Sequence, residues 1–355
     1  MKISSLFKDK AYAFSHKGDP EEDCSFAVRV LQKIKPNIKV SDILLHQVKD
    51  YCDVFLVHTE KNDLLKLKIS LSDPDELLRK EATAIRSCKG FKGVPQLVDQ
   101  GSVEVGEPIC YLLSRVPPAE SIREYGRSGV NEKIKIFLES YWQFNQTRPV
   151  RQTYKRVLDR FSEQLIPSNI LPDESLVAVK SYTDYPLCEE ILLSLNSELL
   201  DSFEKTKDNL KEKCHGALSL DSVFLGGDYI YFDDLYNVSM GHPFLDFIDL
   251  SLELGIPKGE EMSLFSTFCE AGGVVPSREL YYNLYDLQIR KKLTEFLTSY
   301  IKEVYLYDSF RYEKILFIAD SFSHCYDKFC DVNIFKENRD FIMKTVCEPI
   351  FGVKA

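Results

Sequence analysis

The stretch CHGALSLDSVFLGGDYIYFDDLYNVSMGHPFLD, residues Cys214–Asp246, decides the fold. It contains two short apolar runs, Val223–Leu225 and Tyr229–Phe232, on either side of Gly226-Gly227-Asp228. Apolar runs of this length are typical of strands, and glycine supplies the positive φ angles of a tight turn. The pattern therefore predicts a β-hairpin.

Polar residues flank the predicted hairpin. His215-Gly216 and Asp221-Ser222 precede its first strand, and Asp233-Asp234 follow its second strand. Because the two strands of a hairpin run antiparallel, both polar groups would lie at one edge. Such an arrangement is typical of sites for phosphate and metal ions.

The same stretch resembles a known family. His-Gly-x-Leu at 215–218, the hairpin, an aspartate and Gly-His-Pro-Phe-x-Asp at 241–246 are similar to the catalytic core of the aminoglycoside phosphotransferase and choline kinase family. The resemblance implies an α+β, bilobal, protein-kinase-like fold with a small β-rich N-lobe and a large helical C-lobe. Family members usually read His-Gly-Asp-Leu-x-x-x-Asn, whereas this chain has Ala217 at the carboxylate position and Ser222 at the amide position.

The order of predicted elements agrees with that fold. We expect an N-terminal extension with one helix over residues 1–39, an N-lobe over 40–116, and a helical C-lobe over 117–355 that contains the hairpin of residues 214–246. Apolar periodicity and end signals predict the N-lobe elements. They are strands Val54–Val57 and Leu64–Leu71, helix Asp75–Cys88, and strands Val94–Val98 and Cys110–Leu113 around a loop, Asp99–Pro108. Helical periodicity in the C-lobe covers 132–146, 154–165, 189–213, 264–270, 278–307 and 312–329.

Lys68 is the predicted phosphate-binding cation. Phosphoryl transfer needs a cation on the nucleotide phosphates, carboxylates for magnesium and a base at the acceptor hydroxyl. By resemblance, Lys68 matches the family's strand lysine and Glu81 matches its partner on the next helix, so the two are expected to pair. Lys66 lies on the same strand face and is the alternative lysine. Two solvated surface charges are the competing interpretation.

The resemblance also predicts a Mg²⁺ site. Asp234 matches the family's metal-binding aspartate better than Asp233 does. Ser222 stands at the second ligand position, where a hydroxyl is a poorer ligand than an amide oxygen, and the adjacent Asp221 would have to compensate. Asp246 matches a downstream aspartate that we interpret as structural.

The predicted base position carries an alanine. A methyl group at Ala217 neither accepts a proton nor orients a hydroxyl, and loss of a positioned base costs about 10²–10⁴-fold in rate. Ala217 is therefore either a natural loss or a substitution that silences an active enzyme. The stretch Gln47–Asp53, at the place of the family's phosphate-covering loop, lacks glycine and favours natural loss. His215 is expected to support the loop by packing and hydrogen bonding.

The linker that ends in Pro117-Pro118 marks the predicted lobe boundary, because proline cannot donate to a strand ladder. In the resembling family the backbone at this hinge binds the adenine edge. The resemblance therefore implies ATP contacts at Ser114, Arg115 and Val116. An ordinary linker explains these residues equally well.

Composition restricts the partners. A formal charge of −10 argues against binding to nucleic acid or to an anionic membrane, both of which need a dense positive surface. Ten cysteines without metal-ligand spacing are typical of a reducing compartment. The chain shows no signal peptide and no window of ~18 apolar residues. We therefore expect a cytoplasmic protein whose partners are a nucleotide and a small-molecule or protein acceptor.

Two functions follow from the resemblance. The first is an ATP-dependent phosphotransferase of the aminoglycoside or choline kinase type, which acts on a small-molecule hydroxyl and lacks its base as written. The alternative is a pseudokinase that binds nucleotide or a partner protein without phosphoryl transfer. A different α/β fold with an accidental motif match is the third interpretation.

Overall fold

The computed structural model describes residues 20–49, 51–71, 76–117, 120–121, 126–165, 185–226, 229–305 and 322–344. These residues group into two compact units. The sheet unit contains the described residues up to 151 together with 220–238, and the helical unit contains those of 152–219 and 239–344. The predicted hairpin thus belongs, by its contacts, to the sheet unit.

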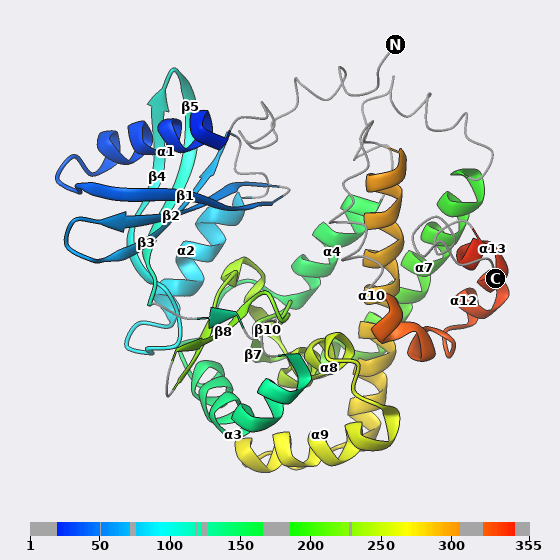
Figure 1. The fold of residues 1–355 in the computed structure, drawn as a ribbon. Helices are drawn as coiled ribbons and strands as arrows, with labels where there is room; N and C mark the ends of the chain where they lie inside the picture. Colours follow the sequence, from blue (N-terminus) through cyan, green and yellow to red (C-terminus); the bar gives the residue numbers. More distant parts are fainter. Residues whose placement is uncertain are drawn as a thin grey trace. The chain divides into compact units, whose positions relative to one another are not determined.

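A five-stranded antiparallel sheet with the order β1-β2-β3-β5-β4 forms the core of the sheet unit (Figure 1). Its strands are β1 Val40–Val48, β2 Asp53–Thr59, β3 Leu64–Ser70, β4 Gln96–Val105 and β5 Glu107–Arg115. Strand β3 separates two environments because successive side chains alternate between the faces. Leu65, Leu67 and Ile69 pack in one apolar cluster with helix α1, Pro20–Ile34, which confirms the helix predicted in the N-terminal extension. Lys66 and Lys68 point to the other face.

Helix α2, Leu77–Ser87, packs against β4 and β5 and carries Glu81 among its buried residues. It begins two residues after the predicted start at Asp75. Its N-cap is Glu76, which has a left-handed backbone and makes no capping hydrogen bond with its side chain. Residues 72–75, which include the predicted start at Asp75, lie outside the described part of the chain.

The prediction of a loop over Asp99–Pro108 was wrong. Strands β4 and β5 pair from Gln96↔Arg115 to Val105↔Glu107, with one shift of register between Leu97 and Asp99. The chain turns at Gly106, whose φ of 83° is left-handed and therefore suits glycine. The alternation of Ser102, Val103, Glu104 and Val105 is that of a strand with one partly buried face.

The hairpin at the centre of the sequence is present as predicted. Strand β8, Val223–Gly226, pairs with β9, Tyr229–Phe232, and the short β6, Glu120–Ser121, adds a third strand. The tip, residues 227–228, lies outside the described residues. Helix α3, Gly126–Asn145, supports β9, because Ser140 Oγ accepts a hydrogen bond from Ile230 N–H at 3.2 Å and the rings of Phe144 and Phe232 lie 5.3 Å apart.

Helix α10 forms the centre of the helical unit. It packs against both α7 and α8 (Figure 1). Strands β7 and β10 form a two-stranded ladder. The elements are α4 Tyr154–Leu165, α7 Tyr185–Thr206, η5 Lys207–Asn209, β7 Glu212–Cys214, β10 Ser239–Gly241, α8 Pro243–Glu253, α9 Lys258–Gly272, α10 Arg278–Tyr305, α12 Asn333–Glu337 and α13 Arg339–Ile342. The helix predicted over 189–213 therefore ends early, and 312–321 of the last predicted helix fall outside the described residues.

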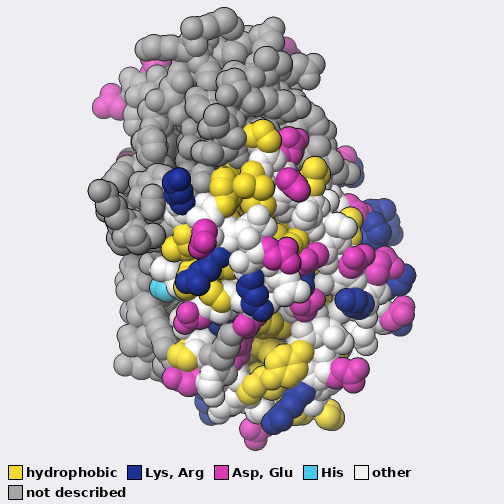
Figure 2. Space-filling view, turned by 90° about the vertical axis from the view of Figure 1, so that its right-hand side faces the viewer, with side chains coloured by type: hydrophobic (Ala, Val, Ile, Leu, Met, Phe, Trp, Pro, Cys, Tyr) yellow, Lys and Arg dark blue, Asp and Glu magenta, His cyan; other side chains and the backbone are white. Residues whose placement is uncertain are grey.

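Charged side chains share the described surface with apolar ones. On the face drawn in Figure 2, acidic and basic side chains are interspersed. Pairs at helical spacing are common, as between Lys155 Nζ and Asp159 Oδ1 at 2.7 Å, and each contributes about 0.3–0.5 kcal/mol. Among the described helices, none combines the length and the apolar character needed to cross a bilayer.

Candidate functional site

The lysine and glutamate that the sequence predicts to pair are in contact. Lys68 Nζ lies 2.7 Å from Glu81 Oε1 and 2.8 Å from Glu81 Oε2. It also lies 2.9 Å from Asp234 Oδ1. Both Lys68 and Glu81 are 1% exposed. Strand β3, helix α2 and the end of β9 thus bring one ammonium group and two carboxylates together within the sheet unit.

Two more lysines join this cluster. Lys66 Nζ contacts Asp233 Oδ2 and lies over the Phe224 ring, 5.6 Å from its centroid. Lys49 Nζ contacts Asp234 Oδ2. The sequence offered Lys66 only as an alternative to Lys68, whereas both reach the site. Reasoning from the sequence missed Lys49, although it lies in the glycine-free stretch at the place of the family's phosphate-covering loop.

Strong mutual interactions keep Lys68 and Asp234 charged. Burial by itself raises the pKa of Asp234, but the ammonium groups of Lys49 and Lys68 outweigh it and hold that pKa well below its usual value. Burial by itself lowers the pKa of Lys68, but Asp234 and Glu81 outweigh it and hold that pKa well above its usual value. Lys68 and Asp234 are therefore an ammonium and a carboxylate at neutral pH.

The backbone places Asp234 in an uncommon conformation. Its φ of 57° and ψ of 46° are left-handed, which aspartate tolerates better than most residues other than glycine. The residue before it is fixed by the hairpin, because Asp233 N–H donates to Ser222 O at 2.9 Å. The register of the hairpin therefore puts Ser222 beside the two aspartates, and the left-handed turn aims Asp234 at the lysines.

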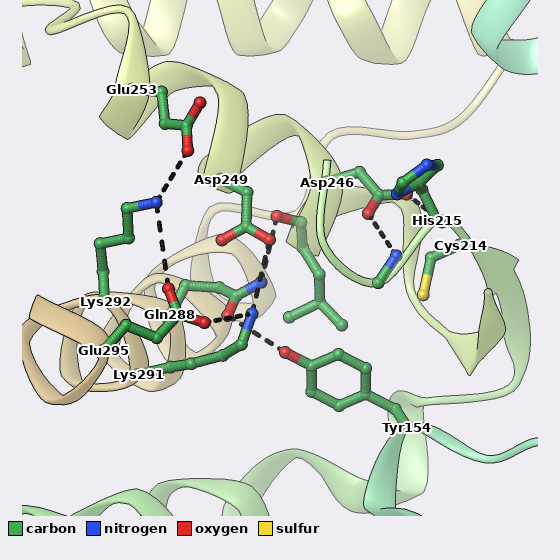
Figure 3. Close-up of polar contacts among 12 residues, drawn as sticks. Tyr154, Cys214, His215, Asp246, Asp249, Glu253, Gln288, Lys291, Lys292 and Glu295 are labelled. Carbon is green, nitrogen blue, oxygen red and sulfur yellow. Dashed lines mark hydrogen bonds and ion pairs between the residues drawn. The ribbon is translucent and has the colours of Figure 1, made fainter. Parts of the chain in front are cut away.

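In the helical unit, Asp246 fixes the loop that contains the predicted base position (Figure 3). Asp246 Oδ2 accepts a hydrogen bond from His215 N–H at 2.6 Å, and Oδ1 accepts one from Gly216 N–H at 2.8 Å. His215 and Asp246 are both 0% exposed. Asp246 thus binds the backbone of the loop, whereas the supporting role predicted for the His215 side chain stays a prediction. Ala217 follows directly, so the loop is held in place although its base is missing.

A buried charge network ties α8, which carries Asp246, to α10 (Figure 3). Lys291 Nζ lies 3.8 Å from Asp249 Oδ2, and Lys292 Nζ lies 2.8 Å from Glu253 Oε1. Burial raises the pKa of Asp249 to about 7, despite the nearby Lys291. The network fixes α8, and with it Asp246, against α10.

The predicted adenine-binding residues lie at the end of β5. Ser114 pairs with Lys66 of β3, and the exposed Arg115 guanidinium lies 3.4 Å from Asp63 Oδ2. Val116 N–H donates to Leu64 O at 3.1 Å. The sheet therefore uses this N–H group, so an adenine contact at Val116 would rest on its carbonyl oxygen.

The three carboxylates have the chemistry of a metal site, but each of them is already engaged by a lysine. Oxygen atoms of Glu81, Asp233 and Asp234 lie within 4.8 Å of one another, and Mg²⁺ prefers such ligands. Each of these carboxylates accepts from a lysine, however, and both oxygens of Asp234 do so. The arrangement as folded therefore does not fit a divalent cation at Asp234.

Comparison with known proteins identifies the fold. No protein-family model and no curated protein sequence matches the chain. Its structure is similar to that of the amicoumacin kinase hAmiN in complex with AMP-PNP, Ca²⁺ and Ami, with a TM-score of 0.59 and 13% identity over 84% of this chain and 93% of that one. It is also similar to the choline kinase LicA from Streptococcus pneumoniae, with a TM-score of 0.53 and 14% identity over 85% of this chain and 99% of that one.

A third similar structure is an aminoglycoside-3'-phosphotransferase of type VIII, with a TM-score of 0.52 and 14% identity over 76% of this chain and 98% of that one. The chain therefore has the bilobal α+β protein-kinase-like fold, as the sequence predicted. Within that class, its fold is the one shared by aminoglycoside phosphotransferases and choline kinases.

Proposed function

We propose that the protein binds ATP through the sheet unit and transfers no phosphoryl group at an appreciable rate. The observation that carries this proposal is Lys68, held between Glu81 and Asp234. An ammonium group fixed in this way by two carboxylates is pre-positioned for an anionic oxygen. A phosphate oxygen would take over one of its three donors from a carboxylate oxygen. The nucleotide in the similar hAmiN structure adds support.

Two features oppose catalysis. Ala217 offers no base to orient an acceptor hydroxyl, although Asp246 holds the preceding residues in place. The Lys49 ammonium lies at Asp234, so Mg²⁺ at Asp234 and Ser222, as the sequence predicts, would have to displace it. Both features favour the pseudokinase. A cytoplasmic location and a small-molecule or protein partner remain parts of the proposal.

ATP binding tests the proposal. The full chain is titrated with ATP by calorimetry, once in EDTA and once with Mg²⁺. We expect binding by the wild type in at least one condition and a loss of about tenfold or more in affinity for Lys68→Met. Lys61→Met removes one exposed lysine of the same unit and is the matched control. A wild-type protein that binds no ATP in either condition contradicts the proposal.

A phosphotransferase is the second candidate, because the buried Lys68–Glu81 pair is retained. Restoring the carboxylate with Ala217→Asp tests it. If the chain descends directly from an active enzyme, ATP turnover should rise by about 10²-fold or more, the contribution of a positioned base. Turnover that stays at the wild-type level favours the pseudokinase.

A further inference from the structure

Lys49 takes one of the two oxygen atoms of Asp234. Its ammonium contacts Oδ2, while Lys68 Nζ lies 2.9 Å from Oδ1. The side chains of Lys49 and Asp234 are only 12% and 19% exposed. Because water screens this pair little, the attraction exceeds that of a surface pair. Lys49 is therefore bound where a metal ion would need the carboxylate.

The loop that carries Lys49 is packed against the segment that carries Asp234. Lys49 N–H donates to Cys52 O at 2.9 Å and so closes the loop between β1 and β2. The buried Tyr51 ring meets the Tyr236 ring edge-on, with centroids 5.1 Å apart and an interplanar angle of 62°. Tyr236 lies two residues after Asp234. The same short segments thus supply the aromatic contact and the ion pair. Packing of Tyr51 against Tyr236 therefore places the Lys49 ammonium at Asp234.

The charges of the cluster balance without a metal ion. Its three ammonium groups, those of Lys49, Lys66 and Lys68, face three carboxylates, those of Glu81, Asp233 and Asp234. A divalent cation would add two positive charges beside three others in a region of low water content, which is unfavourable. A triphosphate brings negative charge instead, and ammonium groups bind phosphate oxygens well.

We propose that the Lys49 ammonium replaces a divalent cation at Asp234, so that the sheet unit binds ATP without metal. This inference rests on the proposed nucleotide binding. An ammonium group has three donors, so Lys49 can keep Asp234 and still donate to a phosphate oxygen. Lys49 thereby removes the need for a divalent cation when the nucleotide binds.

Calorimetric titration with ATP tests this role in the full chain. For the wild type and for the control Lys61→Met, we expect affinities in EDTA and in Mg²⁺ that agree within about twofold. For Lys49→Met, which keeps most of the apolar stem, we expect about tenfold weaker binding in EDTA and recovery with Mg²⁺. Lys49→Arg keeps the charge and should behave as the wild type. Circular dichroism melting checks that each variant is folded.

Titration with Mn²⁺ alone, followed by electron paramagnetic resonance, gives a second readout. Lys49→Met should bind one Mn²⁺ at the vacated carboxylate, whereas the wild type and Lys49→Arg should bind at least about tenfold more weakly. Wild-type protein that binds ATP only with Mg²⁺, or equal metal responses of the wild type and Lys49→Met, overturns the inference and leaves nucleotide binding intact. Absence of ATP binding by the wild type both in EDTA and in Mg²⁺ overturns both proposals.

Discussion

The Lys68 ammonium lies 2.9 Å from the Asp234 carboxylate, although 166 residues separate them in the chain. The contact joins a strand of the five-stranded sheet to the residue that follows the hairpin, and it connects the Glu81 pair to the Lys49 pair. Buried charges of this kind are costly to separate, because each would lose its partner in a region that water does not reach. Their coupling gives the first prediction.

Lys68→Met should destabilise the sheet unit by about 3–5 kcal/mol, because Glu81 would remain buried without its partner. Adding Glu81→Gln should recover about 1 kcal/mol or more, since the amide carries no charge. Urea unfolding monitored by fluorescence of Trp142, the chain's one tryptophan, reports on this unit. Strictly additive effects of the two substitutions would argue against a coupled pair.

Asp246→Asn should destabilise the helical unit by about 1–3 kcal/mol, because an amide offers one acceptor where two backbone N–H groups need two. Those groups belong to His215 and Gly216. Thermal unfolding of the full chain measures the effect. Asp208→Asn, at an exposed position of the same unit, is the control and should change little. Equal melting temperatures for the two variants would be inconsistent with a stabilising role of the hydrogen bonds that Asp246 accepts.

The N-cap of α8 should make stability depend on pH. His242 Nδ1 accepts a hydrogen bond from Phe244 N–H at 3.2 Å, and burial lowers the pKa of His242 to about 4. Histidine in the unfolded chain binds a proton below pH ~6.5, so the unfolded state holds more protons between these two values. Stability is then full above pH ~6.5 and falls as the pH decreases toward 4, by at most about 3 kcal/mol.

His242→Asn isolates this contribution, because asparagine also caps helices but does not titrate. The free energy of unfolding of the wild type should fall more than that of His242→Asn between about pH 7 and pH 4.5. Glu212 Oε1, 3.7 Å from His242 Nε2, would reduce the difference by attracting the protonated ring. Parallel pH profiles for the two proteins would refute the prediction.

Two cysteines should resist alkylation. Cys52 and Cys214 are buried free thiols, and burial raises the pKa of Cys52 to about 12 and that of Cys214 well above its usual value. Because the thiolate is the reactive form, both should stay unmodified by iodoacetamide at about pH 8 in the native protein. Among the described cysteines, the partly exposed Cys24, Cys110 and Cys330 should react first. Peptide mass spectrometry measures the modification, and rapid native-state labelling of Cys52 would contradict it.

Local patterns account for the parts of this molecule that were predictable. Alternation along β3 puts Lys66 and Lys68 on one face, since side-chain direction in a strand repeats every two residues. The pairing of Lys68 with Glu81 was predicted from the resemblance to the kinase family, in which a strand lysine pairs with a glutamate of the next helix, and the two side chains are in contact. The error at Asp99–Pro108 has a local cause too, because glycine there marks a turn within a hairpin rather than a long loop.

The order of strands and helices, the hairpin and the alanine at position 217 can all be read along the chain, because they depend on neighbouring residues and short periods. The placement of Lys49 at Asp234 cannot, since the two residues are 185 positions apart and the contact depends on the packing of Tyr51 against Tyr236. Long-range packing determines which ammonium group contacts which carboxylate. The charges have to balance because an unpaired charge in a buried region destabilises the fold.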